Sequence, residues 1–512
     1  MTKLAAGIAL TPLAFVLANG TAQSATERSG LYIDQRENIL GTSLDLKIVA
    51  RSYAAARQAE SVILTEIDRL TSLLSGYDAA SEFSRWASTF GRAVPVSTDL
   101  WTVLHAFDTW SARTGGAINA ASEAIAQLWQ QAARSQTMPD EADRLRAVAA
   151  ARQTHWQLDA AAQTATRLTQ TPLRLNTFTK SYVLDQAATR AMQQPGVDGL
   201  VLNSGGDLVI RGDWQELVHV ANPTDFAENA QPLARLAVSN RAVATSGDYK
   251  RGVTVGGIRY SHLIDPQTGW PAGAVASATV IHPDPVTAGA LATAFNVLSP
   301  AESARLAASL PGTEYLIITP AGRQFTSPDW QQLVAASPVA TAEQQPDQTA
   351  SLLSVGSRKD KQWNASQELL INFELNAFPG RSHRPFVAVW VEDQKHEPVR
   401  NLALWYNKPR WLPELRAFYA QQRDANIDVS SITSATRSPG AYTIQWDGKD
   451  NAGQYVKQGS YTICIETARE HGTYQLIRQS MDFNGKPKQQ TLNGNVEVTT
   501  AALDYREKAG SR

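Results

Sequence analysis

The chain concentrates its unusual residues in four consecutive motifs: Asn203-Ser-Gly-Gly-Asp207, Ala244-Thr-Ser-Gly-Asp-Tyr249, Ser261-His-Leu-Ile-Asp-Pro-Gln-Thr-Gly269 and Thr287-Ala-Gly-Ala-Leu-Ala-Thr293. The two glycines of the first motif follow a short apolar strand and permit a sharp turn or a close approach of the backbone to a ligand. The hydroxyls and amides of the second motif could cradle a phosphate. Each motif alone is weak, because a Gly-Gly turn is most often structural.

The third motif admits two interpretations. Asp265-Pro266 followed by Thr268-Gly269 predicts a turn, and His262 stands just before it at the end of a predicted strand. His262 is either a catalytic residue, because an imidazole titrates near neutral pH, or a surface histidine beside a turn that Asp265 caps.

Around these motifs, residues 30–335 mix helix and strand patterns and predict an α+β domain. In 54–76, apolar residues recur at helical spacing, and a helix over 288–298 is expected to be capped by Thr287. Further helices are predicted over 99–114 and 120–134, and short strands over 200–203, 207–211, 279–282 and 315–318.

The second half of the chain has a different pattern. Residues 338–366 are polar and predict a linker. Residues 367–490 contain short strands separated by Gly, Asn, Asp and Pro, which predicts a β-sandwich, and 491–512 are expected to be a tail. Its strands are expected over 369–375, 386–392, 442–446 and 461–466. The polar stretch Glu466–Gly472 is either a ligand cluster or a solvated strand end.

Composition narrows the function classes. The 512 residues carry a formal net charge of −1, so no basic excess favours nucleic-acid binding. Cys464 is the only cysteine, which excludes an intramolecular disulfide and a zinc site built on cysteines.

The N-terminus predicts export. Lys3 precedes an apolar run from Leu4 to Ala18, and small residues follow it. This run is shorter than the roughly 20 residues that a spanning helix needs. We therefore expect residues 1–25 to be a secretory signal peptide, and the mature protein to be periplasmic or otherwise extracytoplasmic without stable membrane insertion. The alternative is a retained N-terminal anchor.

The motifs, taken in order, resemble the ApbE-type FAD:protein FMN transferases over residues 35–335. The four motifs above are preceded by Leu40-Gly41-Thr42, Leu74-Ser75-Gly76-Tyr77, Ser81-Glu82-Phe83, Gly116-Ala117-Ile118-Asn119 and Thr179-Lys180-Ser181-Tyr182 with Asp185. The resemblance implies an α+β enzyme that splits FAD and attaches FMN through its phosphate to a Ser or Thr of an acceptor protein.

The resemblance also implies site residues. The flavin nucleotide is expected to be bound by Leu40, Tyr77, Ala117, Ile118, Asn119, Lys180 and Ile264, and Mg²⁺ by Thr177 and Thr293. His262 is the candidate base for the acceptor hydroxyl, and Asp265 is its substitute or orients it.

Four positions depart from the family's pattern. Gly289, Asn119 and Arg174 stand where an aspartate is usual, and Ser181 stands where glycine is usual. Arg174 and Lys180 could then neutralise a pyrophosphate, or Asp284 or Asp265 could supply a relocated carboxylate. We expect position 289 in the first turn of its helix, where an aspartate would be tolerated.

The region after the linker resembles the Ig-like module of flagellar hook-capping proteins. The resemblance rests on Trp446-Asp-Gly-Lys-Asp-Asn-Ala-Gly453 and the following strand, with Trp446 expected in the core and the Asp/Asn/Gly run in a loop. Scaffolding or target docking is the role expected of it. Two alternatives to the enzyme remain: a flavin-binding protein of the same fold with weak or lost transferase activity, and a surface interaction protein.

Overall fold

The computed structural model describes residues 29–335 and 361–508, apart from 224, 226, 231, 248–251, 379–383, 407–408, 426–432, 435–436, 438 and 471. The predicted signal peptide and most of the predicted linker lie outside these residues. Within the described part, no helix is both long and apolar enough to cross a membrane.

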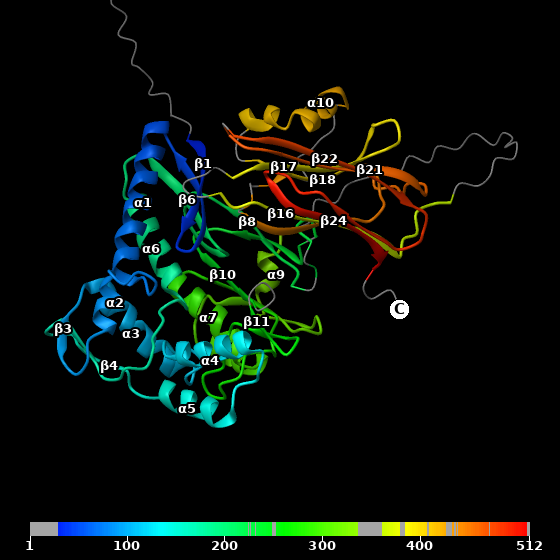
Figure 1. The fold of residues 1–512 in the computed structure, drawn as a ribbon. Helices are drawn as coiled ribbons and strands as arrows, with labels where there is room; N and C mark the ends of the chain where they lie inside the picture. The colour runs from blue at the N-terminus through cyan, green and yellow to red at the C-terminus, as the bar shows by residue number, and fades with distance from the viewer. Residues whose placement is uncertain are drawn as a thin grey trace, which may run out of the picture.

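An antiparallel sheet of eight strands is the frame of the first domain (Figure 1). Its strands are, in spatial order, β1 (Gly30–Ile39), β2 (Thr42–Ala50), β6 (Val197–Ser204), β7 (Asp207–Gly212), β10 (Ala242–Gly247), β13 (Ser277–His282), β14 (Glu314–Ile318) and β15 (Gln324–Thr326). Because successive side chains of a strand point to opposite faces, Leu200 and Leu202 belong to one core cluster and Val201 to another. Both faces of this sheet are therefore covered.

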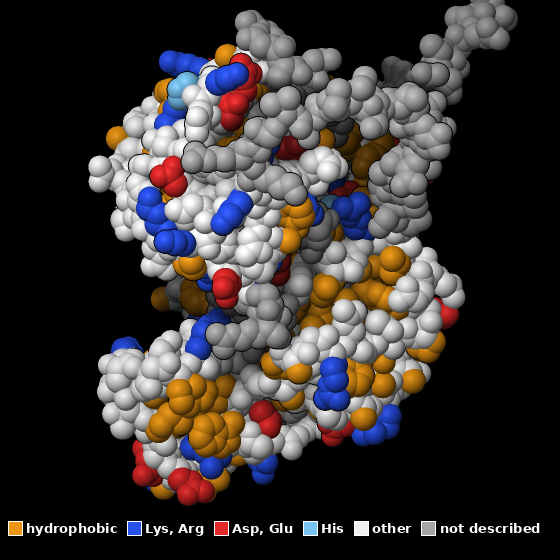
Figure 2. Space-filling view, turned by 90° about the vertical axis from the view of Figure 1, so that its right-hand side faces the viewer, with side chains coloured by type: hydrophobic (Ala, Val, Ile, Leu, Met, Phe, Trp, Pro, Cys, Tyr) orange, Lys and Arg blue, Asp and Glu red, His pale blue; other side chains and the backbone are white. Residues whose placement is uncertain are grey.

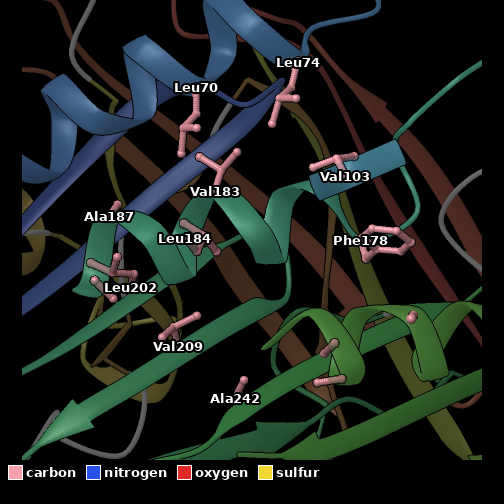
Figure 3. Packing of buried hydrophobic residues seen from close by; sticks show 14 of the residues in the cluster. Leu70, Leu74, Val103, Phe178, Val183, Leu184, Ala187, Leu202, Val209 and Ala242 are labelled. Carbon is pink, nitrogen blue, oxygen red and sulfur yellow. The ribbon is translucent and has the colours of Figure 1, made fainter. Parts of the chain in front are cut away.

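Three helices cover the face on which the site is built: α1 (Tyr53–Leu74), α6 (Thr179–Met192) and α7 (Pro285–Val297). Figure 3 shows Leu70 and Leu74 of α1 above Val183 of α6, with Leu202 and Val209 of the sheet beneath. The residues that carry the predicted helical stripe of α1, Ile63, Ile67, Leu70 and Leu74, are all buried. The helical spacing of these apolar residues therefore predicted the buried face of α1 correctly.

Smaller elements complete the first domain and confirm the α+β class. The hairpin β8 (Glu216–Val220) and β9 (Ala234–Val238) and the short α9 (Trp330–Leu333) pack against the opposite face of the sheet. The others are α2 (Glu82–Ala87), β3 (Ala93–Pro95), α3 (Thr98–Arg113), α4 (Ser122–Ser135), α5 (Glu141–Ala151), β4 (Trp156–Asp159), β5 (Thr164–Arg167), β11 (Gly252–Val255), β12 (Ile258–Ser261) and α8 (Pro300–Ala308).

The second domain packs two sheets face to face, as a β-sandwich. One sheet is β20 (Gly440–Trp446), β16 (Gln367–Leu375), β24 (Val498–Glu507) and β23 (Lys488–Leu492). The other is β19 (Thr433–Ser434), β18 (Pro398–Trp405), β17 (Phe386–Glu392), β21 (Gly459–Ala468) and β22 (Tyr474–Phe483). Trp446 is buried between the sheets, as predicted, and the residues after it form a turn.

Both predicted boundaries of this domain need correction. We expected a tail from residue 491, but β24 pairs with β16 along its whole length and places Leu503 and Tyr505 in the core. Trp363, which we assigned to the linker, is 4% exposed and packs against Trp446. The polar residues between the apolar ones hid both segments, because successive side chains of a strand point to opposite faces and one face of β24 is partly solvated. The Ig-like label remains a prediction.

Glu466 is neither a ligand nor a solvated residue. Its side chain is fully buried, and its two carboxylate oxygens accept the backbone N–H groups of Ala417 and Phe418. These amides begin helix α10 (Arg416–Ala425), which follows the 3-10 turn η1 (Pro409–Glu414) and covers the outer face of the β17 sheet. The carboxylate therefore caps a helix from within the sheet. His471 lies outside the described residues.

The two domains touch at an edge strand. The backbone of β20 pairs with a loop of the first domain: Glu228 donates its N–H to the carbonyl of Thr443 at 2.8 Å, and Asn229 exchanges two hydrogen bonds with Gln445. Arg437 adds an ion pair to Glu228 at 3.3 Å. On the face drawn in Figure 2, charges of both signs are scattered and Lys and Arg do not gather, which fits the near-zero net charge.

Candidate active site

A cavity of about 970 Å³ opens where the helices meet the ends of the central strands. Its wall combines the turn between β1 and β2, the end of α1, the start of α6, the turn between β6 and β7, and the middle of α7. The residues that matter below are Leu40, Tyr77, Thr177, Lys180, Gly205, Asp207, Thr245, Ser246, His262, Gly289 and Thr293. All four motifs singled out in the sequence thus meet in space with segments that precede them in the chain.

The Gly-Gly pair forms the sharp turn that the sequence indicated. Gly205 and Gly206 have φ values of +63° and +99° and form the two-residue turn between β6 and β7. A Cβ atom on Gly205 would lie 3.0 Å from the methyl of Thr42 and 3.5 Å from Lys180 Nζ. The turn is therefore tight, and it brings the backbone close to the lysine.

Lys180 and Asp207 give the cavity its charge pattern. Lys180 stands in the first turn of α6, and Asp207 begins β7 directly after the glycine turn. Burial raises the pKa of the Asp207 carboxyl to about 6, although the Lys180 ammonium and a hydrogen bond from Ser181 act in the opposite direction. The Ser181 hydroxyl donates to Asp207 Oδ2 at 3.4 Å.

Helix α7 starts earlier than the sequence predicted. Its cap is Asp284, whose Oδ2 accepts both the N–H (2.8 Å) and the hydroxyl (2.5 Å) of Thr287, and Pro285 opens the helix. Thr287 is therefore not the cap, because the Asp-Pro pair is the stronger start signal. Gly289 consequently lies in the second turn, with Thr293 one turn further along the same face.

Gly289 faces the start of α6 at close range. A Cβ atom there would overlap the Ser181 hydroxyl and would lie 3.2 Å from Ser181 Cβ and 3.4 Å from Phe178 Cβ. A side chain at position 289 would therefore require Ser181 to shift, which the expectation that aspartate is tolerated there did not take into account. The two departures from the family's pattern, Ser181 and Gly289, occupy the same space.

Six predicted site residues line the cavity, and five do not. Leu40, Tyr77, Thr177, Lys180, His262 and Thr293 are in its wall. Ala117, Ile118 and Ile264 are packed in the protein core with 5%, 1% and 8% exposure. Asn119 faces a second cavity of about 760 Å³, where its amide donates to the Ala151 carbonyl and its oxygen accepts the N–H of Ala121.

Asp265 is occupied by its own turn. Its carboxylate accepts the N–H of Gln267 at 2.8 Å and the hydroxyl of Thr268 at 2.7 Å. It is not among the residues that line the cavity with His262. The structure thus supports the turn-capping interpretation of Asp265.

Arg174 is engaged by neighbouring side chains and is not among the residues that line the cavity. Its guanidinium forms an ion pair with Glu123 at 2.7 Å and lies 4.4 Å from the centre of the Tyr77 ring. Asn176 donates to the Tyr77 hydroxyl at 2.8 Å. Tyr77 is 77% exposed, so these two residues fix the orientation of an aromatic ring that is otherwise largely in solvent.

The cavity offers oxygen donors for a hard cation but few charges. The described residues contain no group of three or more His, Cys, Asp or Glu side chains that could hold a metal. Thr177 and Thr293 provide hydroxyls, and Asp207 provides a carboxylate that the sequence analysis did not select. The only signal for it was an acidic residue directly after the Gly-Gly turn.

Comparison with known proteins identifies the two domains. Residues 40–317 match the model of the ApbE family, and residues 368–500 match the model of a predicted periplasmic protein, DUF2271. The chain is 28% identical to an FAD:protein FMN transferase of Klebsiella pneumoniae over 54% of this chain and 82% of that protein. A transferase of the same name from Escherichia coli is 29% identical over 53% of this chain and 80% of that protein.

Solved structures share the fold of the first domain. The ApbE protein of Thermotoga maritima has a TM-score of 0.53 and 25% identity, and covers 60% of this chain and 100% of its own. The apo flavinyl transferase ApbE of Pseudomonas stutzeri has a TM-score of 0.52 and 22% identity, with 60% and 98% coverage. Since the family model spans more than half of the chain and includes every wall of the cavity, this chain belongs to the ApbE family.

Proposed function

We propose that this chain is an FAD:protein FMN transferase, which splits FAD and attaches FMN to a Ser or Thr hydroxyl of an acceptor protein. The observation that carries the proposal is the convergence of Lys180, His262 and a row of hydroxyl side chains on one cavity of about 970 Å³. That volume suits a dinucleotide, and relatives that cover the same region carry the activity in their names.

The reaction balances without a redox step. The acceptor oxygen forms a bond to the phosphorus of the FMN moiety, the pyrophosphate bond breaks, and AMP leaves with the bridging oxygen. The proton of the acceptor hydroxyl goes to a base, for which His262 is the candidate because it is exposed at the wall of the cavity. Lys180 is placed to offset the charge of the pyrophosphate.

Mg²⁺ fits the donors present, provided that the nucleotide is bound. Thr177, Thr293 and Asp207 would hold it, and Mg²⁺ is usually held by one or two carboxylates together with substrate phosphates. When bound, the ion would neutralise charge that develops on the phosphate oxygens as the P–O bond breaks.

Tyr77 is the surface on which we place the isoalloxazine ring. Arg174 supports one face of the tyrosine ring at 4.4 Å, and the exposed fraction of 77% leaves the other side available. Stacking of two aromatic systems is favourable beyond the area that it buries. Leu40 lines the same cavity and supplies an apolar contact.

The partner is an acceptor protein with a Ser or Thr target, and the setting is extracytoplasmic. The match of the second domain to a predicted periplasmic protein and the signal-peptide pattern of residues 1–25 both support export. The β-sandwich contacts the first domain through β20, which is consistent with a scaffolding or docking role.

The test is direct. The mature protein is incubated with FAD, Mg²⁺ and a protein substrate that other transferases flavinylate, and the product is detected by in-gel flavin fluorescence. The controls are an acceptor whose target Ser or Thr is replaced by Ala, and omission of the enzyme. Fluorescence that appears only with enzyme and intact acceptor supports the function.

A flavin-binding protein without transferase activity is the second candidate. It is favoured by one observation, the absence of a side-chain oxygen at Gly289 in the cavity wall. Binding of FAD without labelling of the acceptor at any Mg²⁺ concentration would place this candidate first.

A further inference from the structure

Asp207 is the only carboxylate among the described residues that line the cavity. It begins β7, directly behind the Gly205-Gly206 turn, and shares the cavity wall with Thr177, Gly289 and Thr293. Among the described residues of the cavity wall, a divalent cation therefore has one source of full negative charge.

Ser181 contacts both Asp207 and the space beside Gly289. Ser181 donates its hydroxyl to Asp207 Oδ2 at 3.4 Å. The same hydroxyl occupies the place where a Cβ atom on Gly289 would lie. The Ser181 hydroxyl thus lies between Asp207 and the space that a side chain at position 289 would enter.

The other acidic residues near α7 are committed elsewhere. Asp284 caps the helix through Thr287, and Asp265 accepts two hydrogen bonds within its own turn. Arg174, which the sequence offered as a substitute for a cation, is paired with Glu123 at 2.7 Å. None of these three side chains is free to serve the cavity.

We propose that Asp207 is the carboxylate that binds the divalent cation in this protein, with the Thr293 hydroxyl as a second ligand, and that Ser181 positions Asp207 for it. The inference rests on the proposed function, because the remaining ligands are oxygens of the FAD pyrophosphate. One carboxylate and neutral hydroxyls hold Mg²⁺ weakly by themselves, so the cation binds tightly only together with the nucleotide.

The experiment measures metal binding rather than transfer. Mn²⁺ replaces Mg²⁺, and free Mn²⁺ is followed by its EPR signal during titration of the full protein with FAD present and no acceptor. FAD affinity is measured separately by flavin fluorescence in EDTA. Asp207→Asn should weaken Mn²⁺ binding by about 10–100-fold, the range known for groups that support a metal site, while FAD affinity in EDTA stays within about threefold.

A rescue and a control separate ligation from folding. In the Asp207→Asn protein, the pair Ser181→Gly and Gly289→Asp supplies a carboxylate on the neighbouring helix and should restore Mn²⁺ binding. Asp284→Asn removes a carboxylate from the same helix but outside the cavity, and asparagine still caps, so Mn²⁺ binding should be unchanged.

The outcomes are distinguishable. If FAD binds and Asp207→Asn leaves Mn²⁺ affinity unchanged, the assignment of Asp207 is overturned while the transferase function stands. If the parent protein binds FAD neither in EDTA nor with Mn²⁺ present, the proposed function fails, and the metal site fails with it. Loss of Mn²⁺ binding that the paired substitution restores confirms a carboxylate requirement met by Asp207.

Discussion

Substitution of Gly289 tests the contact between α6 and α7 most sharply. Gly289→Ala adds one methyl group, which would overlap the Ser181 hydroxyl and lie 3.2 Å from Ser181 Cβ. Rotation of the serine hydroxyl removes the first conflict but not the second, since Cβ moves only with the backbone of α6. Extra atoms in a packed core cost about 1–3 kcal/mol, so this contact should be destabilising.

Helix propensity acts in the opposite direction. Alanine is favoured over glycine inside a helix by about 1 kcal/mol. In the parent background the two effects offset each other in part, and the net change in stability is small or destabilising by about 2 kcal/mol at most. In the Ser181→Gly background the conflict is absent, so Gly289→Ala should stabilise the protein by about 1 kcal/mol.

A double-mutant cycle therefore separates the energy of the steric contact between residues 181 and 289 from the effect of helix propensity. The four proteins are the parent, Ser181→Gly, Gly289→Ala and the double variant, and residues in direct contact typically show coupling of about 0.5–3 kcal/mol. Thermal unfolding of the first domain reports it, with about 2–4 °C expected per kcal/mol for domains of roughly 200 residues. A coupling energy near zero would refute the claim that Ser181 and Gly289 share one space.

Three further predictions concern separate parts of the chain. His262→Ala should reduce FMN transfer by about 10²–10⁴-fold with FAD affinity nearly unchanged, and equal transfer rates in variant and parent would eliminate the catalytic role. Arg174→Ala releases the Tyr77 ring, so FAD affinity measured by fluorescence titration should fall about 2–5-fold, in line with an exposed cation–π contact; no change would show that the tyrosine needs no support. Glu466→Ala leaves the N–H groups of Ala417 and Phe418 without their acceptor and should destabilise the β-sandwich by about 1–3 kcal/mol, while FAD binding persists; loss of FAD binding in this variant would mean that the domains depend on each other.

The spacing of apolar residues predicted helices and strands, and the order of the motifs along the chain predicted the family. The apolar period of 54–76 and the short apolar runs at 200–203 and 279–282 correspond to α1, β6 and β13, because burial of one face or both leaves a direct imprint on residue choice. The first part of the chain was therefore assigned to the right fold class. Lys180 and His262 were predicted as site residues from the ordered motifs that carry the family resemblance, and both line the cavity.

What the sequence concealed depends on contacts between distant residues. Asp207 was only the first residue of a predicted strand, and the approach of α6 is what shows that it shares the cavity with Lys180. The overlap of Ser181 with position 289 joins residues that are far apart in the chain, so no local pattern reports it. The prediction that Asn119 lines the flavin cavity was wrong. Its motif marks the family, but the motif alone does not show which cavity the side chain faces.

The residues that depart from the family's pattern have contacts that suit their side chains. These contacts help to decide whether the site has been rebuilt around other residues or has lost its function. Arg174 has Glu123 as its ion-pair partner, and Asn119 has both its amide donor and its oxygen satisfied. Ser181 fills the space that Gly289 leaves, so the two changes form one packing solution.

Decay of an unused site would be expected to fill the cavity with apolar side chains, because no ligand then requires the space. Here Lys180, Asp207 and His262 still face an open cavity, and Tyr77 is held at its edge by two polar contacts. The proposed cation site at Asp207 would explain this combination with a single relocation of charge, from α7 to the start of β7. It also predicts that the exchange of Ser181 and Gly289 for Gly and Asp restores the family's arrangement only when both positions change together.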